Sequence, residues 1–342
     1  MRRKTSLQVL FAGTPAIAVP SLKALSCMEQ EGEGISLVGI LTNPDRPRRH
    51  GQAEPSDVSA AATRLDAVRK EQGLPPIIQL KPDKLDGRAR EEVAALSPDL
   101  LVSFSYGHIF GPRFLALFPL GGINIHPSLL PKYRGASPIP AQILADEKET
   151  GICIQRLAVE MDAGDIIVKD VFALSGRETA LSLSETVSEK AALLLRELLH
   201  GKCSDGNFAS RVAEAKPQEG EAVYCRQIKK EDGLIDWNKS AVQIDAQIRA
   251  YTPWPLSFTH RGKDTLIILE ARPLESSPAI ADAPDATAVP GTVLGVDKGN
   301  GILIQTGDGI LAVSRLQWRT KKALDWKAFC NGERAFLNSN LS

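Results

Sequence analysis

The sequence predicts a two-domain α/β protein: a Rossmann-like, doubly wound and mostly parallel sheet, followed by a small β-barrel. The chain has 342 residues, more than a single domain usually contains. Over the first two-thirds, strand-like and helix-like segments alternate, which indicates a sheet with helices on both faces. Short strand-like runs separated by Gly-rich turns follow, and these are typical of a small barrel. We therefore expect domains at 1–204 and 223–342, joined by a linker at 205–222.

Elements of the first domain follow from apolar runs and from helix-start signals. Thr14 followed by Pro15 is typical of an N-cap and first helical residue. Ile123 and Ile125 alternate with polar neighbours, which is the period of a strand. The expected strands are 7–12, 35–41, 76–80, 99–104, 122–126, 151–157 and 166–172. The expected helices are 16–26, 57–72, 88–96, 137–145 and 180–200, the last with Gly201 as its C-cap.

The last third has a different character. One short helix is expected at 241–250, followed by strands at 257–259, 266–269, 292–294, 302–304 and 310–313. Gly-rich turns at 298–301 and 306–309 separate several of these strands. The stretch 273–290, rich in Ala, Pro and Asp, is expected to be a loop between strands.

Composition sets limits on location and cofactors. The 41 Lys and Arg balance the 41 Asp and Glu, so net charge does not indicate a nucleic-acid-binding protein. The apolar run 7–12 is too short for a secretion signal, and no run reaches the ~18 residues of a membrane helix. The five cysteines are far apart and form no CxxC pair, which favours reduced thiols without a metal. We expect a cytoplasmic protein without a membrane segment.

Asn124 and His126 are the first candidates for chemistry. Side chains two apart on a strand share a face, so the amide and the imidazole project together. They lie at the carboxyl end of an expected parallel strand, where this architecture binds ligands. An amide donor beside an imidazole can polarise a carbonyl and move a proton. Asp162, in a second turn-rich segment, could orient that imidazole. The alternative is a polar pair that merely satisfies loop carbonyls.

Several motifs now place the chain near a known family. His-Pro-Ser-Leu-Leu-Pro-x-x-Arg-Gly-Ala-x-Pro begins at His126, and Asp-x-Gly-Asp begins at Asp162. Matching segments also occur at 11–15, 42–47, 230–237 and 248–255, in the expected order and over nearly the whole chain. With these motifs the sequence resembles the folate-dependent formyltransferases. The resemblance implies the formyltransferase fold, with an OB-like barrel as the second domain.

The resemblance also implies a reaction and a cofactor site. The co-substrate would be 10-formyltetrahydrofolate, and its formyl group would reach an amine through a tetrahedral adduct without a metal or a covalent enzyme intermediate. Asn124 would donate to the developing oxyanion, and His126 would give a second donor or carry the proton. Asp162 is expected to fix the tautomer of His126, to raise its pKa and to help relay the proton. Formyl-folate is expected at Phe104, Tyr106, Ser128, Leu129, Leu130 and Pro131.

The expected acceptor depends on a basic cluster at 45–51. In an arbitrary protein, Arg46, Arg48 and Arg49 would be a solvated loop. In the tRNA-modifying members of the family, a basic insertion at this place reaches the acceptor stem, which implies initiator methionyl-tRNA as the partner of a monomer. Arg49 is favoured for that contact. The alternatives are a sugar-amine or glycinamide-ribonucleotide formyltransferase with the same trio, or a non-catalytic protein that binds folate or RNA.

Overall fold

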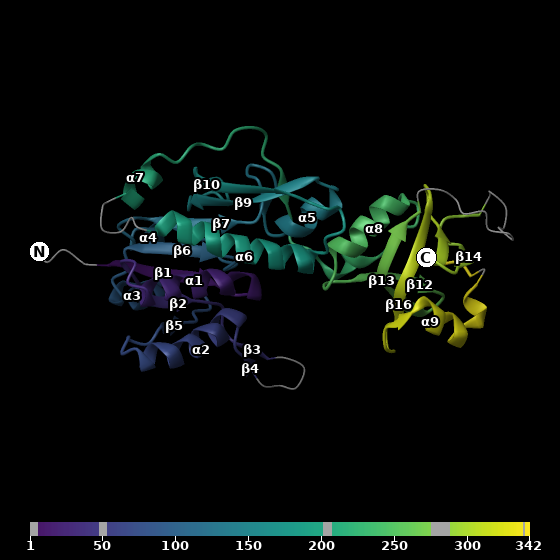
Figure 1. The fold of residues 1–342 in the computed structure, drawn as a ribbon, viewed down its shortest axis with the longest axis horizontal. Coiled ribbons are helices and arrows are strands. Elements are labelled where there is room, and N and C mark those ends of the chain that lie inside the picture. Colours follow the sequence, from purple (N-terminus) through teal and green to yellow (C-terminus); the bar gives the residue numbers. More distant parts are fainter. Residues whose placement is uncertain (1–5, 48–52, 201–206, 275–287, 338) are drawn as a thin grey trace, which may run out of the picture. The chain divides into compact units, whose positions relative to one another are not determined.

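The computed structural model describes residues 6–47, 53–200, 207–274, 288–337 and 339–342 (Figure 1). The chain divides into two compact units, each with its own sheet and apolar core. Unit 1 comprises residues 1–138, 149–173 and 184–225. Unit 2 comprises residues 139–148, 174–183 and 226–342. Among the described residues, no helix has the length and apolar character needed to cross a bilayer.

Unit 1 contains a seven-stranded sheet in the order β10-β9-β7-β6-β1-β2-β5. Five strands are mutually parallel, and β9 and β10 run antiparallel to their neighbours, which confirms the predicted mostly parallel sheet. The carboxyl ends of the parallel strands therefore meet at one edge. The strands are β1 Leu7–Gly13, β2 Ile35–Leu41, β5 Ile78–Leu80, β6 Leu100–Phe104, β7 Gly122–His126, β9 Glu149–Arg156 and β10 Ile166–Ala173.

Helices pack against this sheet because its strands are apolar on both faces. Leu10 lies in a buried cluster with Val93 of α3 and Phe114 of α4, and the alternate residue Phe11 is also fully buried. Ser188 of α6 donates to the carbonyl of Ile17 at 2.8 Å, beside the start of α1. The helices are α1 Val19–Gln30, α2 Asp57–Glu71, α3 Gly87–Ala95, α4 Pro112–Leu115, α5 Pro138–Leu144, α6 Ala180–Leu199 and α7 Asn207–Ala213.

The first helix differs from its prediction. A short 3-10 turn, Ala16–Ala18, precedes α1, and the N-cap of that turn is Pro15 without a side-chain hydrogen bond. Thr14 is not a cap, because its hydroxyl donates to the carbonyl of Tyr106 at 3.3 Å. The stretch expected to be a linker contains α7. Gly201, the expected C-cap of α6, lies outside the described residues.

The base of the basic loop is a two-stranded antiparallel ladder. β3 (Arg46–Pro47) pairs with β4 (Ala53–Glu54), so Arg46 lies opposite Glu54. Arg46 is exposed. Arg48 and Arg49 lie outside the described residues. A second short ladder joins β8 (Arg134–Gly135) to β11 (Tyr224–Cys225) in parallel.

Unit 2 contains an antiparallel sheet in the order β12-β13-β16-β15-β14, with β17 paired to β16. The last residues join its two ends, because Leu341 donates to Gly291 beside β14 while Ser342 and His260 of β12 exchange two backbone hydrogen bonds. The sheet thus closes in the manner of the small barrel that the sequence predicts. Its elements are α8 Ala241–Ala250, β12 Ser257–Arg261, β13 Asp264–Pro273, β14 Val293–Asp297, β15 Gly301–Gln305, β16 Ile310–Trp318, β17 Leu324–Asp325 and α9 Trp326–Gly332.

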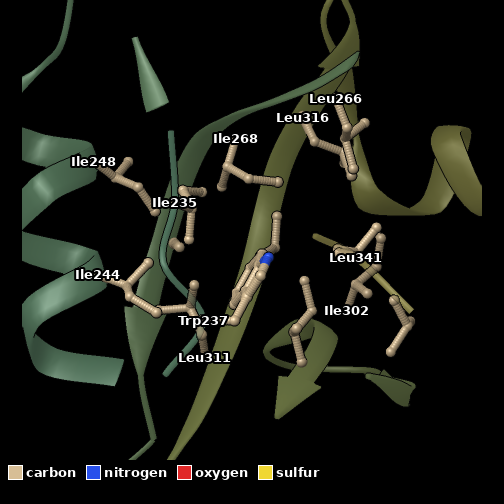
Figure 2. Close-up of a cluster of buried hydrophobic side chains, with 14 of the residues drawn as sticks. Ile235, Trp237, Ile244, Ile248, Leu266, Ile268, Ile302, Leu311, Leu316 and Leu341 are labelled. Carbon is tan, nitrogen blue, oxygen red and sulfur yellow. The ribbon is translucent and has the colours of Figure 1, made fainter. Parts of the chain in front are cut away.

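The core of unit 2 lies between α8 and the inner face of this sheet. Figure 2 shows Ile244 and Ile248, four residues apart on α8, directed toward Trp237 and Ile268. The indole N–H of Trp237 donates to the hydroxyl of Thr259 at 2.9 Å, so the buried ring leaves no donor unpaired. The short elements β17 and α9 were not predicted, and most of the expected 273–290 loop lies outside the described residues.

Candidate active site

Two elements of unit 1 bring the predicted trio together. Asn124 and His126 project from β7, and Asn124 pairs with Gln155 on β9. Asp162 lies in the turn between β9 and β10 with a φ of 54°, a left-handed conformation that Asp tolerates better than most residues. Position 164 in the same turn requires glycine, because a Cβ there would lie 1.8 Å from the carbonyl oxygen of Arg156. This close approach folds the turn back onto β9.

The carboxylate of Asp162 is the centre of the site. Its Oδ1 accepts from Asn124 Nδ2 at 3.3 Å and from Gln155 Nε2 at 3.2 Å. Its Oδ2 accepts from the backbone N–H of Gly135 at 2.9 Å. The Nδ1 of His126 lies 3.5 Å from Oδ1. The structure therefore places an amide, an imidazole and a carboxylate around one point at the carboxyl edge of the sheet.

The tautomer of His126 is set by a backbone carbonyl. Nε2 lies 2.8 Å from the carbonyl oxygen of Tyr133. A carbonyl can only accept, so Nε2 carries the proton and the lone pair of the neutral ring lies on Nδ1, facing Asp162. The expectation that Asp162 fixes the tautomer is therefore wrong. Its carboxylate instead faces the nitrogen that gains a proton.

Asp162 raises the pKa of His126, as predicted, but the pKa is lower than usual overall. Burial of the ring lowers this pKa and outweighs the opposing effects of the Asp162 carboxylate and the Tyr133 carbonyl. Arg134 lowers the pKa further. His126 is consequently neutral at pH 7, with Nδ1 available as a base.

The residues predicted to hold formyl-folate surround the same edge, but several have buried side chains. Phe104 and Ser128 are fully buried, and the hydroxyl of Ser128 donates to the carbonyl of Lys132 at 2.6 Å. Leu130 is buried before the cis peptide bond to Pro131. Leu129 packs against Gly151 of β9. These contacts shape the loop from 127 to 133.

Tyr106 contributes differently from its ring and from its backbone. The ring belongs to the core, stacked on Phe110 with centroids 5.5 Å apart, and burial raises the pKa of its hydroxyl. Its carbonyl accepts from Thr14 and from the amide of Asn43, each at 3.3 Å. The backbone, rather than the ring, therefore carries the polar contacts at the strand ends.

Three residues of the site were not predicted. Gln155 donates to Asp162, and its position in an apolar strand is a signal that sequence reasoning could have used. Gln218 Nε2 lies 2.8 Å from the carbonyl oxygens of Asp162 and Gly164. Arg134 donates twice to Gln218 Oε1, at 3.0 and 2.7 Å. Gln218 lies in the expected linker, where no pattern singled it out.

Unit 2 contains a separate cavity of about 460 Å³. Arg177, Arg249 and Arg272 are among its lining residues. Two of these arginines bond to the buried Asp245, at 3.2 and 2.8 Å, and Arg272 bonds to Asn300, so internal partners already use these guanidiniums. None of the trio lines this cavity. In the described part of the chain, no group of three His, Cys, Asp or Glu side chains could hold a metal ion.

Comparison with known proteins now defines the class. Residues 7–199 match the formyl transferase family model, and residues 227–334 match the model of the formyl transferase C-terminal domain. The chain therefore belongs to the formyl transferase family. It is 46% identical to methionyl-tRNA formyltransferase of Treponema denticola, over 97% of this chain and 98% of that protein. The resemblance inferred from the motifs is confirmed.

Solved structures agree on the fold. The N-formyltransferase from Helicobacter canadensis, crystallised with folinic acid and dTDP-3-aminofucose, superposes with a TM-score of 0.61 at 18% identity, over 90% of this chain and 98% of that one. HypX from Aquifex aeolicus, in complex with tetrahydrofolic acid, gives a TM-score of 0.56 at 16% identity. The match covers 96% of this chain but 47% of HypX, so the chain spans about half of that protein.

Proposed function

We propose that this protein transfers the formyl group of 10-formyltetrahydrofolate to the α-amino group of initiator methionyl-tRNA, giving N-formylmethionyl-tRNA for translation initiation. The near full-length similarity to a methionyl-tRNA formyltransferase supports this acceptor. The convergence of Asn124, His126 and Asp162 supports the chemistry and is the observation that carries it. We further propose that the protein acts as a monomer in the cytoplasm.

The oxyanion of the tetrahedral adduct would be stabilised by Asn124. Its amide has two N–H bonds, and the contact with Asp162 uses one of them. The second can donate to the formyl oxygen as that oxygen gains charge. A preorganised neutral donor of this kind is typically worth ~3 kcal/mol of barrier. The formyl carbon would then lie beside β7, within reach of His126.

Proton transfer would pass through Nδ1 of His126. The attacking ammonium must lose a proton, and the neutral Nδ1 can accept it because the Tyr133 carbonyl keeps the other proton on Nε2. The imidazolium formed in this way faces the Asp162 carboxylate, which stabilises its charge. When the bond between N10 and the formyl carbon breaks, the same proton can pass to the folate nitrogen. The nitrogen of the adduct releases its second proton to solvent, so the products are the N-formyl amine, tetrahydrofolate and one proton.

Contacts with tRNA would come from both units. In unit 1 we propose Arg46, Arg48 and Arg49, of which Arg46 is exposed at the base of the β3–β4 ladder. In unit 2, the turn between β16 and β17 presents Arg319, Lys321 and Lys322, all exposed. Such side chains neutralise phosphates without reading the bases. We therefore propose residues 223–342 as the tRNA-binding domain and 1–204 as the catalytic domain.

The first prediction tests reaction and acceptor together. Purified protein is incubated with 10-formyltetrahydrofolate labelled in the formyl group and with initiator methionyl-tRNA, an amino-sugar nucleotide or glycinamide ribonucleotide. Label should enter only the tRNA. Replacing Asn124, His126 or Asp162 by Ala should lower kcat by at least ~10²-fold, the usual scale for losing an oxyanion donor or an acid–base group. Formyl-folate affinity should change much less, since these groups act mainly in the transition state.

Two outcomes would contradict this proposal. Transfer to a sugar amine or to glycinamide ribonucleotide in preference to tRNA would replace the acceptor but keep the trio. Near wild-type turnover in His126→Ala would reject the assigned chemistry whichever acceptor is used.

A further inference from the structure

We infer that the segment 216–225, here called the strap, is part of the catalytic apparatus, with Gln218 as a positioning residue for Asp162. The inference rests on the proposed function, because it assigns a role through Asp162. Its first part, 216–222, lies in the stretch that the sequence alone suggested to be a linker. In the structure this segment follows α7 (Figure 1). It is bridged to Ile166 of β10 through Lys216 and pairs with β8 through β11.

The strap is bonded to unit 1 at both of its ends. At its start, Lys216 and Ile166 exchange two backbone hydrogen bonds of 2.9 and 2.8 Å. At its other end, Val223 donates to Pro131 at 3.2 Å and accepts from Arg134 at 2.8 Å. Cys225 then accepts from Ala136 at 3.1 Å. The strap is therefore an ordered element of the sheet edge, held by the loops that carry the site.

Gln218 connects this element to the Asp162 turn. Its Nε2 lies 2.8 Å from the carbonyl oxygens of both Asp162 and Gly164 and 3.1 Å from Gln155 Oε1. The orientation of the amide is unambiguous, because its oxygen accepts twice from Arg134, which can only donate. Gln218 therefore holds the backbone of the turn, while Gln155 holds both the Gln218 amide and the Asp162 carboxylate.

The other end of the strap acts on the opposite side of the same carboxylate. Gly135 donates to Asp162 Oδ2, and β8 carries this N–H as the pairing partner of Cys225. Gly135 has a φ of 110°, and a Cβ there would lie 2.3 Å from the Cys225 carbonyl oxygen, so the close pairing requires glycine. The Cys225 thiol lies 3.2 Å from the Arg134 carbonyl and 3.5 Å from the Tyr133 carbonyl, which is the acceptor of His126.

These contacts matter because Asp162 has a left-handed backbone. A single residue in that conformation persists only when its surroundings hold it there. The direction of its side chain follows from the backbone, so loss of the Gln218 contacts should let the carboxylate move away from His126. A misplacement of about 1 Å can lower a rate by up to ~10²-fold. The strap thus fixes the position of the Asp162 carboxylate and contributes no reacting group of its own.

The test compares Gln218→Ala and Gln218→Glu with Glu214→Gln, a control change at an exposed position just before the strap. Gln218→Glu keeps the side-chain size and the acceptor for Arg134, but it places an oxygen against two carbonyl oxygens. Both Gln218 variants should lower kcat by ~10-fold or more, with KM for tRNA and for formyl-folate nearly unchanged, because positioning acts on the transition state. Glu214→Gln should keep wild-type kcat. Thermal unfolding of each variant checks that the fold is retained.

A double-variant cycle distinguishes positioning from general stability. If Gln218 acts through Asp162, adding Gln218→Ala to Asp162→Ala should cause no further loss of single-turnover rate. A multiplicative further loss would overturn the inference, as would wild-type kcat in Gln218→Glu. Full turnover in Asp162→Ala would instead reject the proposed function, and the role of the strap with it. A lower kcat in Asp162→Ala, together with wild-type kcat in both Gln218 variants, would overturn only the inference about the strap.

Discussion

Two carboxylates of low exposure, one in each unit, have opposite surroundings. The Asp162 side chain of unit 1 is 11% exposed and accepts from two side-chain amides and one backbone N–H, all of them neutral. The Asp245 side chain of unit 2 is 4% exposed and bonds to the guanidiniums of Arg177 and Arg249. Asp162 has a left-handed backbone in a turn, whereas Asp245 lies within α8.

This difference separates a structural charge from a catalytic one. The guanidiniums neutralise the buried negative charge of Asp245, so this carboxylate exerts little electrostatic effect beyond its two arginine partners. Neutral dipoles stabilise Asp162 without cancelling its charge, and the remaining field acts on whatever cation forms nearby. His126, 3.5 Å away, is the group in which such a cation forms. Low exposure alone would not have distinguished these two residues.

Replacing each carboxylate by an amide should affect turnover in one unit and stability in the other, and this is the largest expected effect. Asp162→Asn should lower kcat by at least ~10²-fold with little change in the free energy of unfolding. Asp245→Asn should lower that free energy by about 3 kcal/mol, because it leaves the buried Arg249 uncompensated, while turnover per folded molecule stays normal. Urea unfolding and steady-state kinetics on both variants measure this. Equal effects of both variants on kcat would remove the distinction.

A second comparison concerns the basic side chains of unit 1. Replacing Arg46, Arg48 and Arg49 together by Ala should raise the KM for tRNA and leave the KM for formyl-folate unchanged. The dependence of log affinity on log salt should flatten by up to ~0.9 per lost phosphate contact, for a charge density like that of B-DNA. Arg88→Ala, on the exposed face of α3, is the control and should change neither quantity. An unchanged salt slope in the triple variant would indicate a solvated loop.

The smallest effect is a shift in the titration of His126. Burial lowers its pKa, so its ring should become protonated only below the usual value of about 6.5. In Asp162→Asn the pKa should fall further, because the carboxylate that opposes burial is lost. NMR titration of the ring protons measures both values. The folded state binds fewer protons than the unfolded state here, so this group destabilises the fold as the pH falls below about 6.5. A His126 pKa above 6.5 would contradict the dominance of burial.

Much of the fold could be predicted because local patterns report it directly. β2, β7 and α8 have the predicted limits, since each is an apolar or amphipathic run with clear turn or cap signals at its ends. The misses were short or depended on distant partners: Thr14 looks like a cap in the sequence, but its hydroxyl is used by Tyr106, 92 residues away. β17 pairs with β16 over two residues, too few for a periodic signal.

The sequence by itself determined the fold class, the family and the positions of Asn124, His126 and Asp162. Period-two alternation and closely spaced motif residues are local patterns, so they can be read without knowing which residues are in contact. Only the tertiary structure decided how these groups are poised. The tautomer of His126 depends on the Tyr133 carbonyl, and its lowered pKa depends on burial by several elements. The contact of Gln218 with the Asp162 carbonyl, across 56 residues, could likewise not be predicted from the sequence. Desolvation and long-range hydrogen bonds arise only when distant segments meet, and no local pattern records them.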